Sequence, residues 1–248
     1  MNPTDNKSAQ PAVVDRAAWQ AELDALRIRE KAHTREGDAI AAARRRLPMV
    51  ETDATAPLIG KEGAVTLLDA FEGRRQLIAY YHMWHAGKTA ARQCEGCTFS
   101  TTHISELSYL HSRDVSYATF CQGPYEESSR YRDFMGWTVP WYSVPPGSVD
   151  RLIANRHFGI LVSYLRDGDK VYETYWTTGR GNEPMATSYG LLDLTVYGRQ
   201  ELWEDSPEGW PRHWDAKGGQ FRLDGRPTAQ WSRLAAGRSD DLGTPAND

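Results

Sequence analysis

The stretch Gln76–Cys97 reads QLIAYYHMWHAGKTAARQCEGC, and it decides the expected fold. Its first nine residues, 76–84, form a near-continuous apolar run, which is typical of a strand buried on both faces. The run leads to Cys94-Glu95-Gly96-Cys97, after which a helix is expected over 97–112. A CxxC pair placed after a buried strand and at the start of a helix is the layout of a thioredoxin-type domain.

The rest of the chain continues this alternation of strands and helices. The expected elements are strands at 115–121 and 138–144, helices near 125–136 and at 183–192, and a hairpin over 160–176. Asp167-Gly168 is a strong hairpin-turn signal. The resulting core order, β-α-β-α-β-β-α, predicts an α/β protein with a thioredoxin-like fold, in which helices flank a central mixed sheet.

Composition suggests four segments. We expect disorder at 1–14, a helical arm at 15–47, a thioredoxin-like domain at 48–200 and an irregular C-terminal extension at 201–248. In the arm, Trp19, Leu23 and Leu26 recur at helical spacing on one stripe. The stripe either lies on the domain or pairs with a second subunit. We favour the second, a homodimer, because so long an arm needs an apolar surface to pack against.

Charge and composition exclude several classes of function. The net charge is −4 over 248 residues, which gives no electrostatic reason to expect nucleic acid or an anionic membrane as a partner. No apolar run reaches the length of a membrane span, and the first residues lack the layout of a secretion signal. There is no Gly-rich phosphate loop. The expected location is therefore the cytoplasm, where a CxxC is more often catalytic or metal-binding than a structural bridge.

The cysteines suggest thiol chemistry. At a helix N-terminus, unpaired amides and the helix dipole stabilise a thiolate, so Cys94 is the expected nucleophile and Cys97 the resolving cysteine. The acidic neighbour Glu95 is expected to raise the pKa of that thiolate slightly. Cys121 ends the strand 115–121, on the sheet edge where sites form, and is either a third member of the site or a buried small apolar residue.

The histidines suggest a metal. His82 and His85 lie at the end of the first core strand, and with Cys94 and Cys97 they form an H-x2-H-x8-C-x2-C array. Two imidazoles and two thiolates suit zinc or copper, although the spacing matches no familiar zinc-finger order.

A set of longer motifs resembles the DUF899 family, a bacterial group of uncharacterised thioredoxin-like proteins. The resemblance covers about Ala17 to Asp215. It implies a thioredoxin-like fold with the CxxC at Cys94 and Cys97, and it implies no assigned reaction. The matching motifs are Arg45-Arg46-Leu47-Pro48-Met49-Val50, Leu68-Asp69-Ala70-Phe71-Glu72-Gly73-Arg74, Cys94-x-Gly96-Cys97-x-Phe99, Met135-Gly136-Trp137-x-x-Pro140-Trp141, Leu165-Arg166-Asp167-Gly168-Asp169 with Val171-Tyr172, Gly179-Arg180-Gly181 and Leu192-Asp193-Leu194-Thr195.

One departure from a typical thioredoxin concerns the cis-proline that faces the CxxC. The corresponding position falls near Arg156-His157-Phe158-Gly159, which contains no proline. With His157 there, the domain resembles the copper-handling Sco-type proteins, which combine two cysteines with one distant histidine. This analogy is at the level of the fold only.

Three functions follow from these residues. The first is a thiol-disulfide oxidoreductase or peroxide-reducing enzyme that acts on a thiol, disulfide or other small molecule. The alternative is a copper- or zinc-binding metalloprotein, oxidase-like or metal-handling, with ligands among His82, His85, Cys94, Cys97 and His157. The third is a structural dithiol in a protein whose arm mediates dimerisation. We favour thiol exchange, because that is the commonest use of a CxxC at this position.

Overall fold

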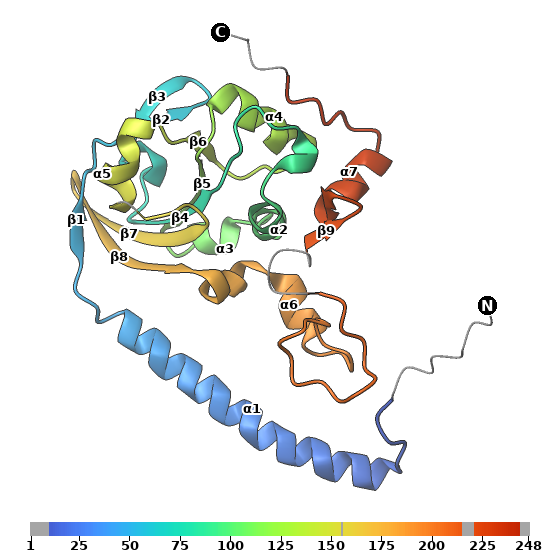
Figure 1. Ribbon diagram of the computed structural model, residues 1–248. Coiled ribbons are helices and arrows are strands. Elements are labelled where there is room, and N and C mark those ends of the chain that lie inside the picture. The colour runs from blue at the N-terminus through green and yellow to red at the C-terminus, as the bar shows by residue number, and fades with distance from the viewer. Residues whose placement is uncertain (1–9, 155, 215–220, 244–248) are drawn as a thin grey trace.

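The structure is a computed structural model that describes residues 10–154, 156–214 and 221–243. Figure 1 shows a sheet with helices packed beside it, a long separate helix at the N-terminal side and a C-terminal extension. The main sheet has eight strands in the order β1-β8-β7-β4-β5-β6-β2-β3. Within the described residues, no helix combines the length and apolar character needed to cross a bilayer.

The bounds of the elements follow the chain. The helices are α1 (Arg16–Arg44), α2 (Glu95–Thr102), α3 (Ser108–His111), α4 (Tyr125–Met135), α5 (Val149–Ile153), α6 (Thr187–Leu192) and α7 (Trp231–Ala235). The strands of the main sheet are β1 (Val50–Thr52), β2 (Pro57–Gly60), β3 (Gly63–Thr66), β4 (Gln76–His82), β5 (Val115–Cys121), β6 (Trp141–Ser143), β7 (Ile160–Asp167) and β8 (Lys170–Thr178). A second, two-stranded sheet pairs β9 (Arg222–Leu223) with β10 (Arg226–Pro227).

The connections confirm the thioredoxin-like fold. Strand β4 pairs in parallel with β5, and the two are joined through α2. Helix α4 follows β5, and β7 then returns antiparallel to β4, with β8 antiparallel to β7 on the outside. The core order β4-α2-β5-α4-β7-β8-α6 is therefore the expected β-α-β-α-β-β-α, and β6 adds a further parallel strand beside β5.

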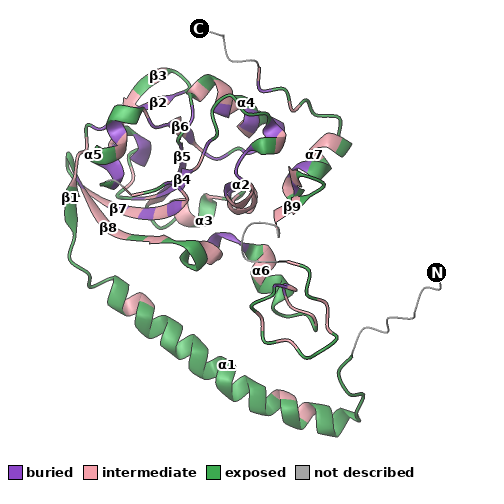
Figure 2. Cartoon of the chain, in the orientation of Figure 1, coloured by how far each residue is buried: buried purple, intermediate pink, exposed green. Residues whose placement is uncertain are grey.

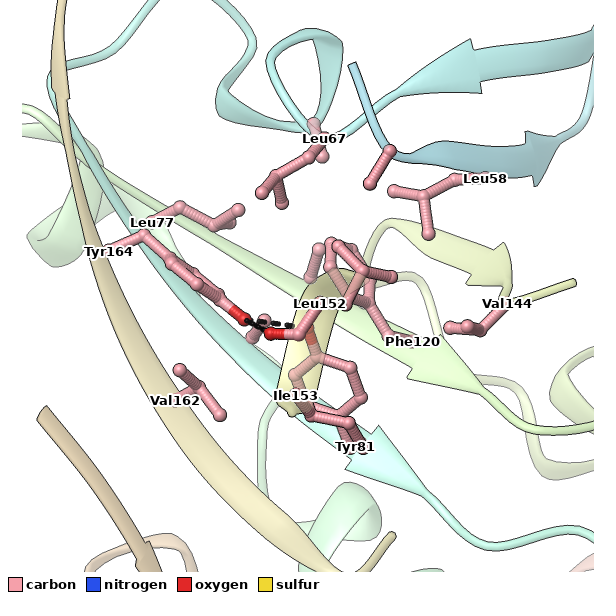
Figure 3. Packing of buried hydrophobic residues seen from close by; sticks show 14 of the residues in the cluster. Leu58, Leu67, Leu77, Tyr81, Phe120, Val144, Leu152, Ile153, Val162 and Tyr164 are labelled. Carbon is pink, nitrogen blue, oxygen red and sulfur yellow. Dashed lines mark hydrogen bonds between the residues drawn. The ribbon is translucent and has the colours of Figure 1, made fainter. Parts of the chain in front are cut away.

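Strand β4 is buried on both faces, as its apolar run predicts. Leu77, Ala79 and Tyr81 belong to one hydrophobic cluster, and Tyr80 belongs to a second cluster on the opposite face. Figure 3 shows the first cluster, in which side chains from the sheet pack against α5 and the β2–β3 hairpin. The second cluster lies against α2 and α4 and contains all three cysteines.

The structure corrects two expected elements. The helix expected over 97–112 is two helices, because α2 ends where the His103 ring bonds the Phe99 carbonyl at 2.7 Å. Glu106 then accepts the Ser108 amide at 2.7 Å where α3 begins. The β7–β8 turn consists of Gly168 and Asp169, one residue later than expected, and Gly168 adopts a φ of +60°. A positive φ costs glycine little, which explains why the turn settles there.

Two parts of the sheet were not predicted in detail. Strand β1 and the β2–β3 hairpin lie within 49–75, where the sequence indicates only a short extended piece. Strand β1 extends the sheet beyond β8, and β2 attaches the hairpin beyond β6 through Ile59 and Ser143. Short strands of three or four residues offer too little alternation to be recognised.

Helix α1 is continuous through Gly37, and Asp15 caps its N-terminus by accepting the Ala18 amide at 2.8 Å. None of its residues is buried, and it is drawn largely as exposed in Figure 2. Trp19 and Leu26, two members of the apolar stripe, are each 46% exposed. Of the segment 1–14 expected to be disordered, residues 10–14 are exposed and without regular structure, and 1–9 lie outside the described residues.

The C-terminal extension returns to the domain. In the expected irregular segment 201–248, β10 and the turn Thr228–Gln230 that follows it pack against α2. Helix α7 comes next, beside that part of the domain in Figure 1. Residues 215–220 and 244–248 lie outside the described residues.

A buried tyrosine pair gives a test of the first cluster. The Tyr81 and Tyr164 hydroxyls lie 2.7 Å apart, and Tyr164 donates to the Leu152 carbonyl at 3.1 Å (Figure 3). Tyr164→Phe leaves both the Tyr81 hydroxyl and that carbonyl unpaired, and is expected to lower the free energy of unfolding by about 2 kcal/mol. Tyr81→Phe is expected to cost about half as much, and Tyr109→Phe, at an exposed site, to change nothing in urea denaturation. Equal losses for Tyr81→Phe and Tyr164→Phe would contradict this account.

The exposed stripe of α1 gives a test of the expected dimer. Leu26 lies on the stripe, whereas Ile28 lies about 180° away from Trp19 on the helix and is 73% exposed. If the stripe pairs two subunits, light scattering is expected to give twice the 28.0 kDa chain mass for the native protein. Leu26→Glu is then expected to give the monomer mass, because it places a charge in the apolar contact, and Ile28→Glu to leave the dimer intact. A monomeric native protein would refute the dimer.

Candidate functional site

Cys94 is the N-cap of α2, at the end of the loop that leaves β4. Its sulfur accepts the backbone N–H of Cys97 at 3.4 Å, so one of the unpaired amides of the helix is directed at it. The Cys94 carbonyl accepts the Thr98 amide and the Thr98 hydroxyl, which fixes the first turn of the helix. The cysteine is therefore held where the helix terminus favours negative charge.

The pKa of the Cys94 thiol is lowered. The largest cause is a hydrogen bond from the Cys97 side chain to the Cys94 sulfur, which favours the thiolate, and burial opposes it. The Cys97 and Gly96 amides lower the pKa further, and the negative charge of Glu95 raises it, as the sequence predicts. The hydrogen bonds outweigh burial, so the net effect is a lowered pKa for Cys94.

Cys97 has the opposite properties. It is 1% exposed, and its sulfur accepts the Met83 amide at 3.4 Å. Its pKa is raised well above the ordinary value, first by burial and then by the hydrogen bond to Cys94 and the charge there. The hydrogen bond between Tyr80 and Cys97 lowers the pKa of Cys97 and so opposes these causes. Of the two thiols, Cys94 therefore loses its proton more readily than Cys97.

Cys121 belongs to the same hydrophobic cluster as this pair but does not line the cleft. It is fully buried, and its sulfur accepts the Gly123 amide at 3.5 Å. Burial raises the pKa of its thiol to about 12. Of its two expected roles, the structure favours the buried small apolar residue, because a thiol with such a pKa is a poor nucleophile at neutral pH.

His82 occupies an apolar position. It is fully buried, and neither ring nitrogen has a hydrogen-bond partner among the described residues. The rings of Trp137 and Trp141 lie 5.9 and 5.3 Å from its imidazole, centroid to centroid. Burial lowers the pKa of His82 to about 3, so the ring is neutral.

The other two histidines expected as metal ligands lie at the surface. His85 and His157 are both exposed, and His85 lies in a loop that Gln93 holds through the His85 amide and carbonyl, each at 3.0 Å. Across the described chain, no three His, Cys, Asp or Glu side chains are grouped so that they could hold a metal ion. The expected copper or zinc site therefore stays a prediction, and the described structure does not group three of its ligands.

Two residues of the C-terminal extension complete the site, and sequence reasoning missed both. Arg222 pairs with Glu95 at 2.9 Å and also donates to the Ala91 and Gln93 carbonyls, each at 2.8 Å. The positive charge of Arg222 thus lies beside Glu95, the acidic residue that follows Cys94 in the chain. A contact across 127 residues leaves no local signal in a single sequence.

Gln230 is the second such residue. It is fully buried and donates to the Ala90 carbonyl at 2.8 Å and to the Tyr131 hydroxyl at 2.6 Å. Tyr131 is bonded to the Thr98 hydroxyl at 2.7 Å, and Thr98 donates to the Cys94 carbonyl at 2.8 Å. A continuous chain of hydrogen bonds thus runs from the extension, through α4, to the backbone of the cysteine.

A cleft of about 690 Å³ opens beside the dithiol. Its walls come from α2, from the end of β4, from the loop before β7, and from the segment that follows β8. Cys94 and Cys97 both line it, and Cys94 is 8% exposed. A small molecule in this cleft would meet the sulfur of Cys94.

Comparison with known proteins gives the family of this chain. The family described as "Bacterial protein of unknown function (DUF899)" matches residues 8–217, which is most of the chain. The chain belongs to the DUF899 family. No match is found among curated proteins.

Two solved structures resemble this DUF899 protein over 57% of its chain and 96% of theirs. One is the peroxidoxin BcpB from Mycobacterium tuberculosis, with a TM-score of 0.38 and 16% sequence identity. The other is the bacterioferritin comigratory protein of Xanthomonas campestris, with a TM-score of 0.35 and 12% identity.

Phe158-Gly159, directly before β7, lines the cleft together with the dithiol in this DUF899 protein. The Gly159 amide donates to the Tyr81 carbonyl at 2.6 Å, and Gly159 has a φ of +87°. A Cβ atom there would lie 3.3 Å from the Met83 methyl group, so a glycine suits the position. No cis peptide bond occurs in the described segments.

The burial of His82 predicts a pH dependence of stability. Its pKa is about 3 in the fold and about 6.5 in an unfolded chain, so the unfolded state binds the proton first. Stability is therefore lost as pH falls from about 6.5 toward 3. The variant His82→Phe lacks this titrating group. Between pH 7 and pH 5, its free energy of unfolding in urea denaturation is therefore expected to fall by about 2 kcal/mol less than that of the native protein.

The matched control for that experiment is His85→Ala, which removes an exposed histidine from the same region. Its loss of stability between pH 7 and pH 5 is expected to equal that of the native protein. Identical pH dependence for His82→Phe and the native protein would show that His82 does not titrate with the expected pKa.

Proposed function

We propose that this DUF899 protein is a thiol-disulfide oxidoreductase in which Cys94 is the nucleophile and Cys97 the resolving cysteine. The observation that carries the proposal is the contact at the start of α2, where the Cys94 sulfur accepts the Cys97 amide at 3.4 Å and lines a cleft. The opposite pKa shifts of the two thiols support the same division of roles.

The reaction proceeds in two exchanges. The Cys94 thiolate attacks one sulfur of a substrate disulfide, forms a mixed disulfide and expels the other substrate sulfur as a thiolate. Cys97 then loses its proton and attacks the Cys94 sulfur, which forms the Cys94–Cys97 disulfide and releases the second substrate thiolate. The dithiol is oxidised by two electrons and the substrate is reduced by two, and a dithiol reductant reverses the sequence.

The raised pKa of Cys97 keeps this thiol protonated until the first exchange has taken place. While Cys94 is a thiolate, its charge and its hydrogen bond hold the proton on Cys97, in addition to the effect of burial. Formation of the mixed disulfide removes the negative charge from Cys94. Cys97 then loses two of the causes that raise its pKa, so it becomes a better nucleophile only after the first exchange.

Alkylation tests the assignment of Cys94. In the reduced native protein, limiting iodoacetamide is expected to modify Cys94, with a rate whose pH midpoint lies below about 8.5, the value of an ordinary thiol. Peptide mass mapping identifies the modified residue. Cys121→Ser is expected to leave rate and midpoint unchanged, because Cys121 is fully buried. A Cys94 that titrates at or above an ordinary thiol would overturn the proposal.

The fate of the mixed disulfide tests the role of Cys97. After reaction with a small disulfide, the native protein is expected to contain the Cys94–Cys97 disulfide and no adduct, as measured by intact mass. Cys97→Ser is expected to retain one substrate sulfur on Cys94, because nothing displaces it. An adduct that stays on the native protein would exclude Cys97 as the resolving cysteine.

A further inference from the structure

The cleft beside Cys94 recesses the reactive sulfur. With 8% of Cys94 exposed, a substrate disulfide reaches its sulfur only by entering the cleft. A volume of about 690 Å³ lies within the range of pockets that hold single small molecules. Small disulfides fit this space, whereas a disulfide lying flat on the surface of a folded protein does not reach the sulfur.

Most of the large side chains that line the cleft are aromatic. They come from β4, α2, the loop before β7, α6 and the C-terminal part of the chain, so aromatic surface is present on several walls. These residues are Tyr80, Phe99, Phe158, Tyr189, Trp203 and Phe221. Faces and edges of aromatic rings favour the burial of other rings and of apolar groups.

The charged residues that line the cleft already have partners among neighbouring side chains. Arg199, whose side chain is 6% exposed, pairs with Glu183 at 3.0 Å and with Asp193 at 2.7 Å. Its guanidinium also lies 4.0 Å from the centre of the Tyr189 ring. Because two carboxylates and one ring use this guanidinium, it offers little attraction to an anionic substrate.

Arg180 and Glu201 also have partners among the neighbouring side chains. Arg180 pairs with Glu183 at 2.7 Å, and its guanidinium lies 4.5 Å from the centre of the Trp203 ring. The Glu201 carboxylate accepts the indole N–H of Trp203. The described residues that line the cleft include two arginines and two glutamates, so the formal charges of the lining cancel.

We infer that the cleft selects small, uncharged disulfides with an aromatic or apolar body, and that it discriminates against anionic disulfides of similar size. This inference rests on the proposed function, because it names the substrate class of the Cys94 exchange. Its physical basis is the burial of an apolar body against rings, combined with the cost of bringing a carboxylate to a lining without free positive charge.

Two aromatic disulfides of similar size test the inference directly. 4,4′-Dithiodipyridine is uncharged at pH 7, and 5,5′-dithiobis(2-nitrobenzoate) carries two carboxylates. Stopped-flow absorbance gives the rate at which each oxidises the reduced protein, and the same two rates with 2-mercaptoethanol correct for their different leaving groups. The corrected ratio of the two rates is expected to favour the uncharged reagent by about tenfold or more, the range of one uncompensated charge interaction.

Substitutions in the cleft are expected to move this ratio in opposite directions. Glu183→Gln removes the carboxylate that Arg180 and Arg199 share, so the lining becomes positive and the preference is expected to fall about tenfold. Arg180→Gln, at a side chain 69% exposed, makes the lining negative and is expected to increase the preference. Glu62→Gln makes the same charge change at a side chain 88% exposed in the β2–β3 turn and is expected to leave the ratio unchanged.

The outcomes separate the inference from the proposed function. If neither reagent oxidises Cys94, or if Cys94→Ser reacts as fast as the native protein, the proposed function fails. If Cys94 reacts with both reagents in the ratio found for 2-mercaptoethanol, the proposed function stands and the substrate class is wrong. If the ratio favours the uncharged reagent but both cleft variants leave it unchanged, the charge pairing is not its origin and the inference is overturned.

Discussion

The hydrogen bond that the Cys97 amide donates to the sulfur of Cys94, at 3.4 Å, is the contact on which the proposed chemistry of this protein depends. It exists because α2 begins at that sulfur, and α2 is held by the second cluster and by the C-terminal extension. The first cluster keeps β4 in place on its other face. The two hydrophobic clusters together therefore fix the position of the N-terminus of α2. Without the Cys94 sulfur, the Cys97 amide there would lack a partner within the helix.

The site is built from parts of the chain that are remote from each other. Gln230, Tyr131 and Thr98 link the extension to the carbonyl of Cys94, and Arg222 balances Glu95. The hydrogen bonds of Gln230, Tyr131 and Thr98 are buried, so each depends on its neighbour to avoid an unpaired polar group. The extension thus belongs to the same packing unit as the dithiol.

Much of the fold could be predicted from the sequence, because long apolar and alternating runs identify β4, β5 and the β7–β8 hairpin. The dithiol could be predicted from its position after β4. The histidines could not be placed, because their surroundings depend on long-range packing. His82 lies against the rings of Trp137 and Trp141, and Gln93 holds the loop that carries His85. Long-range packing also explains why Arg222 and Gln230 were missed, since each bonds a backbone carbonyl more than a hundred residues away.

Because helix α1 is long, a small rotation where it joins the domain moves its far end by a large distance. Its 29 residues extend about 43 Å, and its C-terminal end meets the domain through the short connection to β1. A rotation of about 10° at that connection displaces the far end by about 7 Å. Trp19 and Leu26 lie toward that far end, so the position of the apolar stripe in space is set almost entirely by the geometry of residues 45–49.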